Sequence, residues 1–130
     1  MRTAKADLPA MRFGDYEGRT IDEGPLRIAF ESMPAGFPPD PSVFEGLPDD
    51  RCQCPHHGYL VRGSARVTYL DGREEVINAG DAYVLEPGHF VQTIEDCEFV
   101  EFSPVAEHDV TRAQIMRNVE QIERAAGAGS

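Results

Sequence analysis

The chain has 130 residues, of which 41% are hydrophobic, so it suits a single domain with one apolar core. Its 23 acidic residues outnumber the 12 basic ones and give a formal net charge of −11, which repels phosphate backbones and anionic lipid heads. We therefore expect neither a nucleic acid nor a membrane as partner. No apolar run approaches the roughly 20 residues of a membrane span. The first ten residues (MRTAKADLPA) lack the apolar segment of a secretion signal, so the cytoplasm is the expected location.

Short strands separated by turns dominate the predicted structure. Residues 1–25 are polar and are expected to form an irregular arm, with at most one short edge strand. Residues 34–50 contain five prolines and two glycines and are expected to form a long ordered loop, because proline cannot donate to a strand ladder. This density of short strands and turns is typical of a β-sandwich or a small barrel. The expected strands are residues 26–33, 59–62, 65–70, 73–77, 82–85, 90–94 and 98–102, with Asp71-Gly72 as a hairpin turn.

The hydrophobic period changes after Pro104, where an α-helix is expected over residues 107–126. Asp109 is a suitable N-cap, and the apolar residues then recur at helical spacing. We expect this helix to cover a barrel edge or to pack on a second subunit. Its apolar face consists of Ile115, Val119, Ile122 and Ala126.

Residues 52–57 (CQCPHH) form the densest group of metal-ligand side chains. Cys52 and Cys54 are too close in sequence for an unstrained disulfide, and reduced thiols suit a cytosolic protein. Thiolate and imidazole donors together favour zinc, with iron, copper and nickel as alternatives. The remaining cysteine, Cys97, is interpreted as structural.

Two segments resemble the two sequence motifs of the cupin family. Residues 56–63 (HHGYLVRG) are similar to the end of the first motif, and residues 80–89 (GDAYVLEPGH) are similar to the second. The resemblance covers residues 50–103 and implies an all-β, cupin-type double-stranded β-helix (jelly-roll barrel) over residues 26–104. With the C-terminal helix this makes one domain, residues 1–130. The resemblance also implies a small-molecule pocket and a homodimer.

The ligand set departs from the pattern of the family. The usual site of three histidines and one glutamate is absent, because His56 stands in the place of the glutamate and Val91 in the place of the second-motif histidine. The resemblance thus implies a substituted site. His89 lies on the same strand face as Val91 and is the candidate ligand that replaces the missing second-motif histidine.

Strand alternation selects the other candidates. If His56 points inward, Cys54 and Cys52 share its face and His57 points outward. The predicted metal set is therefore Cys54, His56 and His89, with Cys52 completing a tetrahedron. Pro55 is an interruption that would instead bring His57 inward, and this alternative stays open.

Two acids on predicted strands, Glu31 and Glu101, are expected to face solvent, as polar residues in alternating strands usually do. The alternative is that they face inward as a general acid or base. The loop of residues 34–50 is the candidate lid over the pocket, with Phe37 and Phe44 as its apolar contacts.

Three functions fit these residues. The first is a metal-binding cupin that binds or transforms a small molecule, with a divalent transition metal (zinc first, iron or nickel as alternatives) acting as a Lewis acid or activating dioxygen. The second is a non-catalytic metal or metabolite sensor with a closed Cys/His site. The third is a metal-free barrel. Three protein ligands would favour the first function and four the second.

Overall fold

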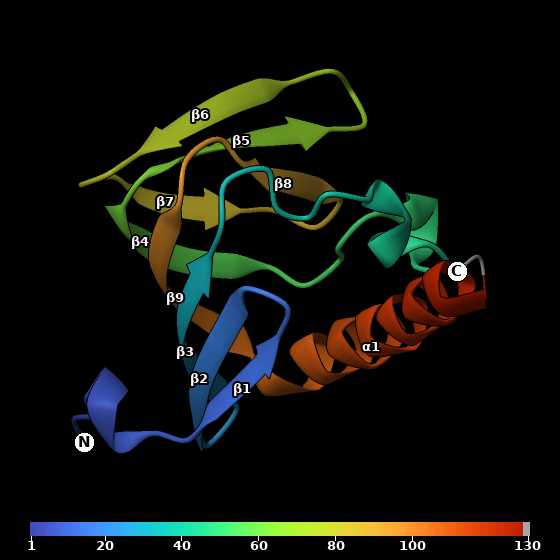
Figure 1. Cartoon of the computed structure of the whole chain (residues 1–130). Helices are drawn as coiled ribbons and strands as arrows, with labels where there is room; N and C mark the ends of the chain where they lie inside the picture. The colour runs from blue at the N-terminus through green and yellow to red at the C-terminus, as the bar shows by residue number, and fades with distance from the viewer. Residues whose placement is uncertain (129–130) are drawn as a thin grey trace.

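The computed structural model describes residues 1–128, which form nine strands, three short 3-10 helices and one α-helix (Figure 1). The elements follow the predicted order of many short strands and a final helix. The 3-10 helices are η1 (Lys5–Asp7), η2 (Pro41–Phe44) and η3 (Pro48–Asp50), the strands are β1 (Ala10–Phe13), β2 (Tyr16–Glu23), β3 (Leu26–Met33), β4 (His56–Arg62), β5 (Ser64–Tyr69), β6 (Glu74–Asn78), β7 (Ala82–Leu85), β8 (His89–Thr93) and β9 (Cys97–Pro104), and the helix is α1 (Val105–Ala128).

The strands form two antiparallel sheets, which confirms the predicted all-β jelly roll with one C-terminal helix. The larger sheet has the order β1-β2-β3-β9-β4-β7 and the smaller one β6-β5-β8. Asp71-Gly72 turns the chain between β5 and β6, where Gly72 has a φ of +89°, as predicted. The core packs between the sheets and contains Leu60, Ala65, Val67, Ile77, Tyr83, Leu85, Cys97 and Phe99.

The expectation of an irregular N-terminal arm is wrong, because most of residues 10–23 belong to β1 and β2. The two strands form a hairpin around Gly14, whose φ is +55°, and residues 17–23 of β2 pair with β3. The charged side chains Arg12, Glu17 and Arg19 bond to one another on this hairpin and obscure the alternation in the sequence. The hairpin therefore extends the large sheet by two strands.

Helix α1 begins at Val105, directly after β9, and so starts two residues earlier than predicted. Asp109 lies inside the helix and is not its cap. Its carboxylate instead pairs with Arg27 of β3, at 2.7 Å, and Arg27 also bonds to Asp22 of β2. This buried arginine holds the N-terminal end of the helix against the large sheet.

The far half of α1 lies beside η2 (Figure 1). Asn118 donates to the carbonyl oxygens of Val43 and Glu45, at 2.8 and 2.7 Å. The helix and residues 34–50 thus close one side of the sheet together.

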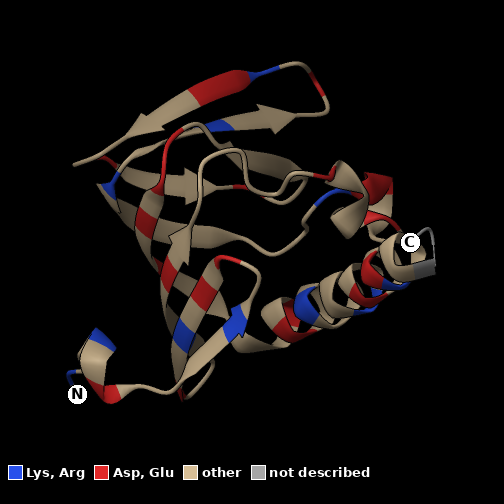
Figure 2. Cartoon of the chain, viewed as in Figure 1, with Lys and Arg blue, Asp and Glu red and all other residues tan. Residues whose placement is uncertain are grey.

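No helix in the described part of the chain combines the length and apolar character needed to cross a bilayer. Acidic residues are spread over strands, loops and α1, with no single cluster (Figure 2).

Leu60 and Val61 are adjacent in β4 and provide a matched test of the core. Leu60 is 0% exposed and Val61 49%. We expect Leu60→Ala to lower the free energy of unfolding by about 2–5 kcal/mol, because it leaves a cavity, and Val61→Ala to lower it by less than about 1 kcal/mol. Urea denaturation of both variants measures the difference. Equal losses would mean that this part of β4 is not oriented as described.

Candidate metal centre

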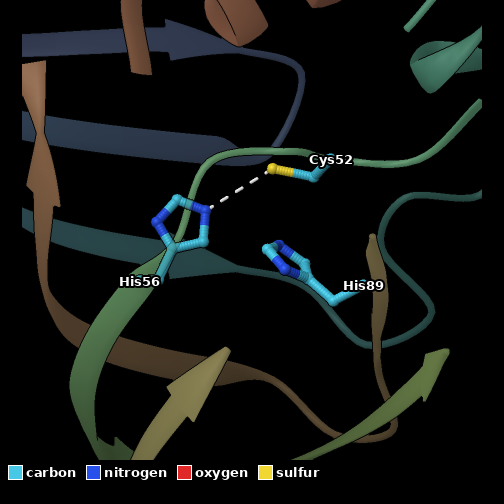
Figure 3. A group of neighbouring side chains, drawn as sticks. All are labelled: Cys52, His56 and His89. Atoms are coloured by element: carbon cyan, nitrogen blue, oxygen red, sulfur yellow. Dashed lines mark hydrogen bonds between the residues drawn. The ribbon is translucent and has the colours of Figure 1, made fainter. Parts of the chain in front are cut away.

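Cys52, His56 and His89 converge inside the domain from two segments, the stretch that leads into β4 and the start of β8 (Figure 3). One donor atom from each lies within 4.8 Å of the other two, and all three residues are buried. Cys52 and His89 are joined by a β-bridge, reinforced by the Gly88 N–H donating to the Cys52 carbonyl oxygen at 2.8 Å. His56 is the first residue of β4. The site is thus held by backbone pairing as well as by packing.

The spacing of the donors suits a tetrahedral transition metal. Metal–sulfur and metal–nitrogen bonds of about 2.3 and 2.0–2.1 Å at a tetrahedral angle place the two donors about 3.6 Å apart. The Cys52 Sγ and His56 Nε2 are 3.6 Å apart. This pair needs no movement to share a metal ion.

Hydrogen bonds fix which nitrogen of each histidine is free. The His89 Nδ1 lies 2.7 Å from the Glu86 carbonyl oxygen, which can only accept, so Nδ1 carries the proton and Nε2 is the donor atom for a metal. The His56 Nδ1 lies 2.6 Å from the Ser103 Oγ. Outer hydrogen bonds of this kind are usual around histidines that bind metals.

Burial sets the protonation of the three side chains. It lowers the pKa of both His56 and His89 to about 4, so each imidazole is neutral near pH 7. Burial also raises the pKa of the Cys52 thiol to about 12. A metal ion at this site must therefore displace the thiol proton.

Cys54 does not join the cluster, in contrast to the prediction. It is fully buried, and its thiol points to the Pro55 carbonyl oxygen at 3.5 Å. Strand alternation did not apply there because β4 begins only at His56, so Cys52 takes the place expected for Cys54. His57 is exposed on the opposite face of β4, and Val91 lines the cavity without a donor atom.

Glu31 and Glu101 face the interior, against the expectation that they face solvent. The Tyr16 hydroxyl donates to Glu31 at 2.7 Å, and the Tyr83 hydroxyl donates to Glu101 at 2.8 Å. Burial, followed by the charge of Glu101, raises the pKa of Glu31 to about 8, and burial also raises the pKa of Glu101. The two carboxyl groups thus hold a proton between them near neutral pH.

Two glycines make room for this carboxyl pair. A Cβ at Gly18 would lie 2.7 Å from the Tyr16 hydroxyl oxygen, and a Cβ at Gly58 would lie 2.5 Å from that of Tyr83. Each glycine therefore leaves the space in which a tyrosine reaches its glutamate. Glu101 also lies 3.6 Å from the His56 Nδ1, so the carboxyl pair adjoins the group of Cys52, His56 and His89.

The cluster and the carboxyl pair share one cavity of about 360 Å³. Helix α1, residues 34–50 and strands of both sheets line it. Both residues predicted for the lid, Phe37 and Phe44, line it. Aromatic rings gather at the end nearest the β1–β2 hairpin, where Phe37 stacks on Tyr16 at 5.7 Å between ring centroids. Further lining residues are Phe13, Ile77, Leu85, Phe99, His108, Thr111, Arg112, Ile115 and Val119.

The architecture is that of a two-sheet β-barrel with potential metal-ligand side chains facing inward, and comparison with solved structures identifies it as the cupin fold. An RmlC-like cupin from Shewanella frigidimarina matches 78% of this chain and 87% of its own, at 14% identity and a TM-score of 0.57. A Bacillus subtilis oxalate decarboxylase with Mn(II) centres matches 78% of this chain at 16% identity and a TM-score of 0.56. An Fe(II) form of HppE matches 79% of this chain and 59% of its own, at 9% identity and a TM-score of 0.56.

The chain spans only 28% of that oxalate decarboxylase and 32% of the Lactobacillus farciminis enzyme, which matches at 18% identity. No family model matches the sequence, and no curated protein matches it. The likeness therefore establishes the fold, and the chemistry has to be argued from the residues of this chain.

The carboxyl pair predicts a dependence of stability on pH. Glu31 has a pKa near 4.5 when unfolded and about 8 when folded, so between these values the folded state binds more protons and loses stability as pH rises. We expect Glu31→Gln, in chelator-treated protein, to raise the melting temperature above pH 8 and to change it little below pH 4.5. Thermal unfolding across this range tests it, with the exposed Glu75→Gln as control. Parallel curves for Glu31→Gln and the parent would contradict the raised pKa.

Proposed function

We propose that this protein is a small metal-binding cupin that holds one divalent transition metal on Cys52, His56 and His89 and captures a small molecule in the adjoining cavity. The observation that carries the proposal is that these three residues both converge on one point and line the cavity. A ligand in the cavity would therefore meet the metal directly.

Three protein ligands favour ligand capture over a closed structural site. The other nearby candidates are directed elsewhere: the Cys54 thiol points to a backbone carbonyl oxygen, and His57 faces solvent. Among the described residues the group of potential ligands has three members. A fourth coordination position would thus remain for water or for the bound molecule, as in catalytic zinc sites.

Zinc is the metal we propose first, because one thiolate and two neutral imidazoles are donors that it accepts readily. Iron and nickel are the alternatives. The Mn(II) and Fe(II) of the similar structures show which metals other proteins of this fold carry, but manganese prefers oxygen donors. When bound, such a metal supplies a Lewis acid to the molecule in the cavity.

The residues around the metal would orient the two histidine ligands and would supply a proton to the bound molecule. Ser103 and Glu86 hold the outer nitrogens of His56 and His89, which keeps both rings directed at one point. The carboxyl pair, Glu31 and Glu101, keeps a proton beside His56 in a largely apolar cavity. This arrangement suits a ligand whose protonation changes when it binds.

Metal titration of two serine variants tests the proposal. We expect chelator-treated parent protein to take up about one equivalent of zinc, and cobalt(II) in its place to give a thiolate-to-metal absorption band. Cys52→Ser should lose the band and bind zinc at least about tenfold more weakly, since it removes a ligand.

Cys54→Ser is the matched control and should retain both the band and the affinity, because Cys54 is equally buried but lies outside the cluster. Loss of the band in Cys54→Ser alone would place the thiolate ligand at Cys54. The absence of zinc, iron and nickel binding by the parent would refute the metal centre.

A further inference from the structure

His108 presents a fixed hydrogen-bond donor to the cavity. Its Nδ1 lies 2.8 Å from the Nη1 of Arg27. A guanidinium group can only donate, so this Nδ1 accepts and the ring carries its proton on Nε2.

The orientation of this ring is rigidly determined. Arg27 is itself held by both carboxylate oxygens of Asp22, at 2.7 and 2.9 Å, and by Asp109. The imidazole ring of His108 is 6.1 Å from that of His56 between centroids and lines the same cavity. Within residues 1–128 its Nε2–H has no acceptor, so the donor remains available to a bound molecule.

Arg112 lies one helical turn after His108, and residues four apart share a helix face. It also lines the cavity. Its guanidinium contacts the Met11 thioether, a weak acceptor. No carboxylate of the described residues lies within 4.0 Å of it, whereas Arg27 has two such partners. An inward-facing cation without an acidic partner, in a chain of net charge −11, indicates an anionic ligand.

The rest of the cavity on this side is apolar. Ile115 and Val119 continue the helix face, and Phe13, Phe37 and Phe44 form the opposing surface. The cavity of about 360 Å³ holds about a dozen non-hydrogen atoms if each takes the roughly 30 Å³ of a liquid water molecule. The ligand that fits is small and mainly hydrocarbon.

We infer that His108 and Arg112 bind the carboxylate of a small organic acid whose apolar body lies among the phenylalanines. The inference rests on the proposed function in taking this cavity as the ligand site, and it names the class of ligand. The rival ligand is an amine, which the carboxyl pair of Glu31 and Glu101 would attract from the opposite wall.

Three probes of matched size separate these classes: 4-phenylbutanoate, 4-phenylbutan-1-ol and 4-phenylbutylamine. Calorimetric titration of the zinc-loaded parent should show the acid binding at least about tenfold more tightly than the alcohol or the amine, the effect of one charge-assisted hydrogen bond. Arg112→Gln should remove this preference, and His108→Phe should reduce it.

Arg112→Lys, which keeps the charge, should retain part of the preference. Arg124→Gln is the matched control, because Arg124 lies on the exposed side of the same helix, paired with Glu120. It should leave the preference unchanged. Circular dichroism confirms that each variant is folded.

Tighter binding of the amine or the alcohol, no binding of the acid, or an unchanged preference in folded Arg112→Gln would overturn the inference. Zinc content measured on the same samples separates the two proposals. Zinc binding without acid preference would refute the acid-binding role alone. An acid preference that persists in protein unable to bind zinc would refute the metal centre alone.

Discussion

The pairing of β9 between β3 and β4 is the constraint on which the rest of the structure depends. This one strand joins the N-terminal hairpin to the barrel, and its register places Glu101 opposite both Ala29 and Gly58. Ser103, two residues later on the same face, then reaches His56. A shift of one residue would turn both side chains to solvent, so the candidate metal site and the carboxyl pair depend on a single strand register.

The interior that results contains several buried polar and charged side chains. Two histidines of the cluster, the carboxyl pair and Arg27 are all withdrawn from water, which costs stability unless each group has a partner. In this structure the partners are present: hydroxyl groups for the carboxyls, a carbonyl and a hydroxyl for the histidines, and carboxylates for Arg27. No buried side-chain nitrogen or oxygen of the described residues lacks a hydrogen-bond partner. Polar groups retained at such cost are typical of functional sites.

Helix α1 contributes to the site as well as covering it. Its first turn is fixed by Arg27 and its middle by Asn118, so the face between them has a defined position over the cavity. That face carries His108, Thr111 and Arg112, which a purely protective helix would not need. The cavity is therefore polar at both walls near the candidate metal site and apolar beyond it.

The sequence by itself determined the barrel and most of its strands, because turn residues and alternation are local properties that act over a few neighbours. It also singled out side chains that can bind a metal, among them His56 and His89, but it placed Cys54 ahead of Cys52. Local patterns did not reveal β1 and β2, where paired charges on the outer face obscure the alternation. Tertiary structure decided which cysteine faces the cluster, because the chain before His56 is not a strand and its orientation follows from the bridge between Cys52 and His89. It also decided that Glu31 and Glu101 face inward. Their burial depends on tyrosines from other strands and on the glycines that leave room for those tyrosines.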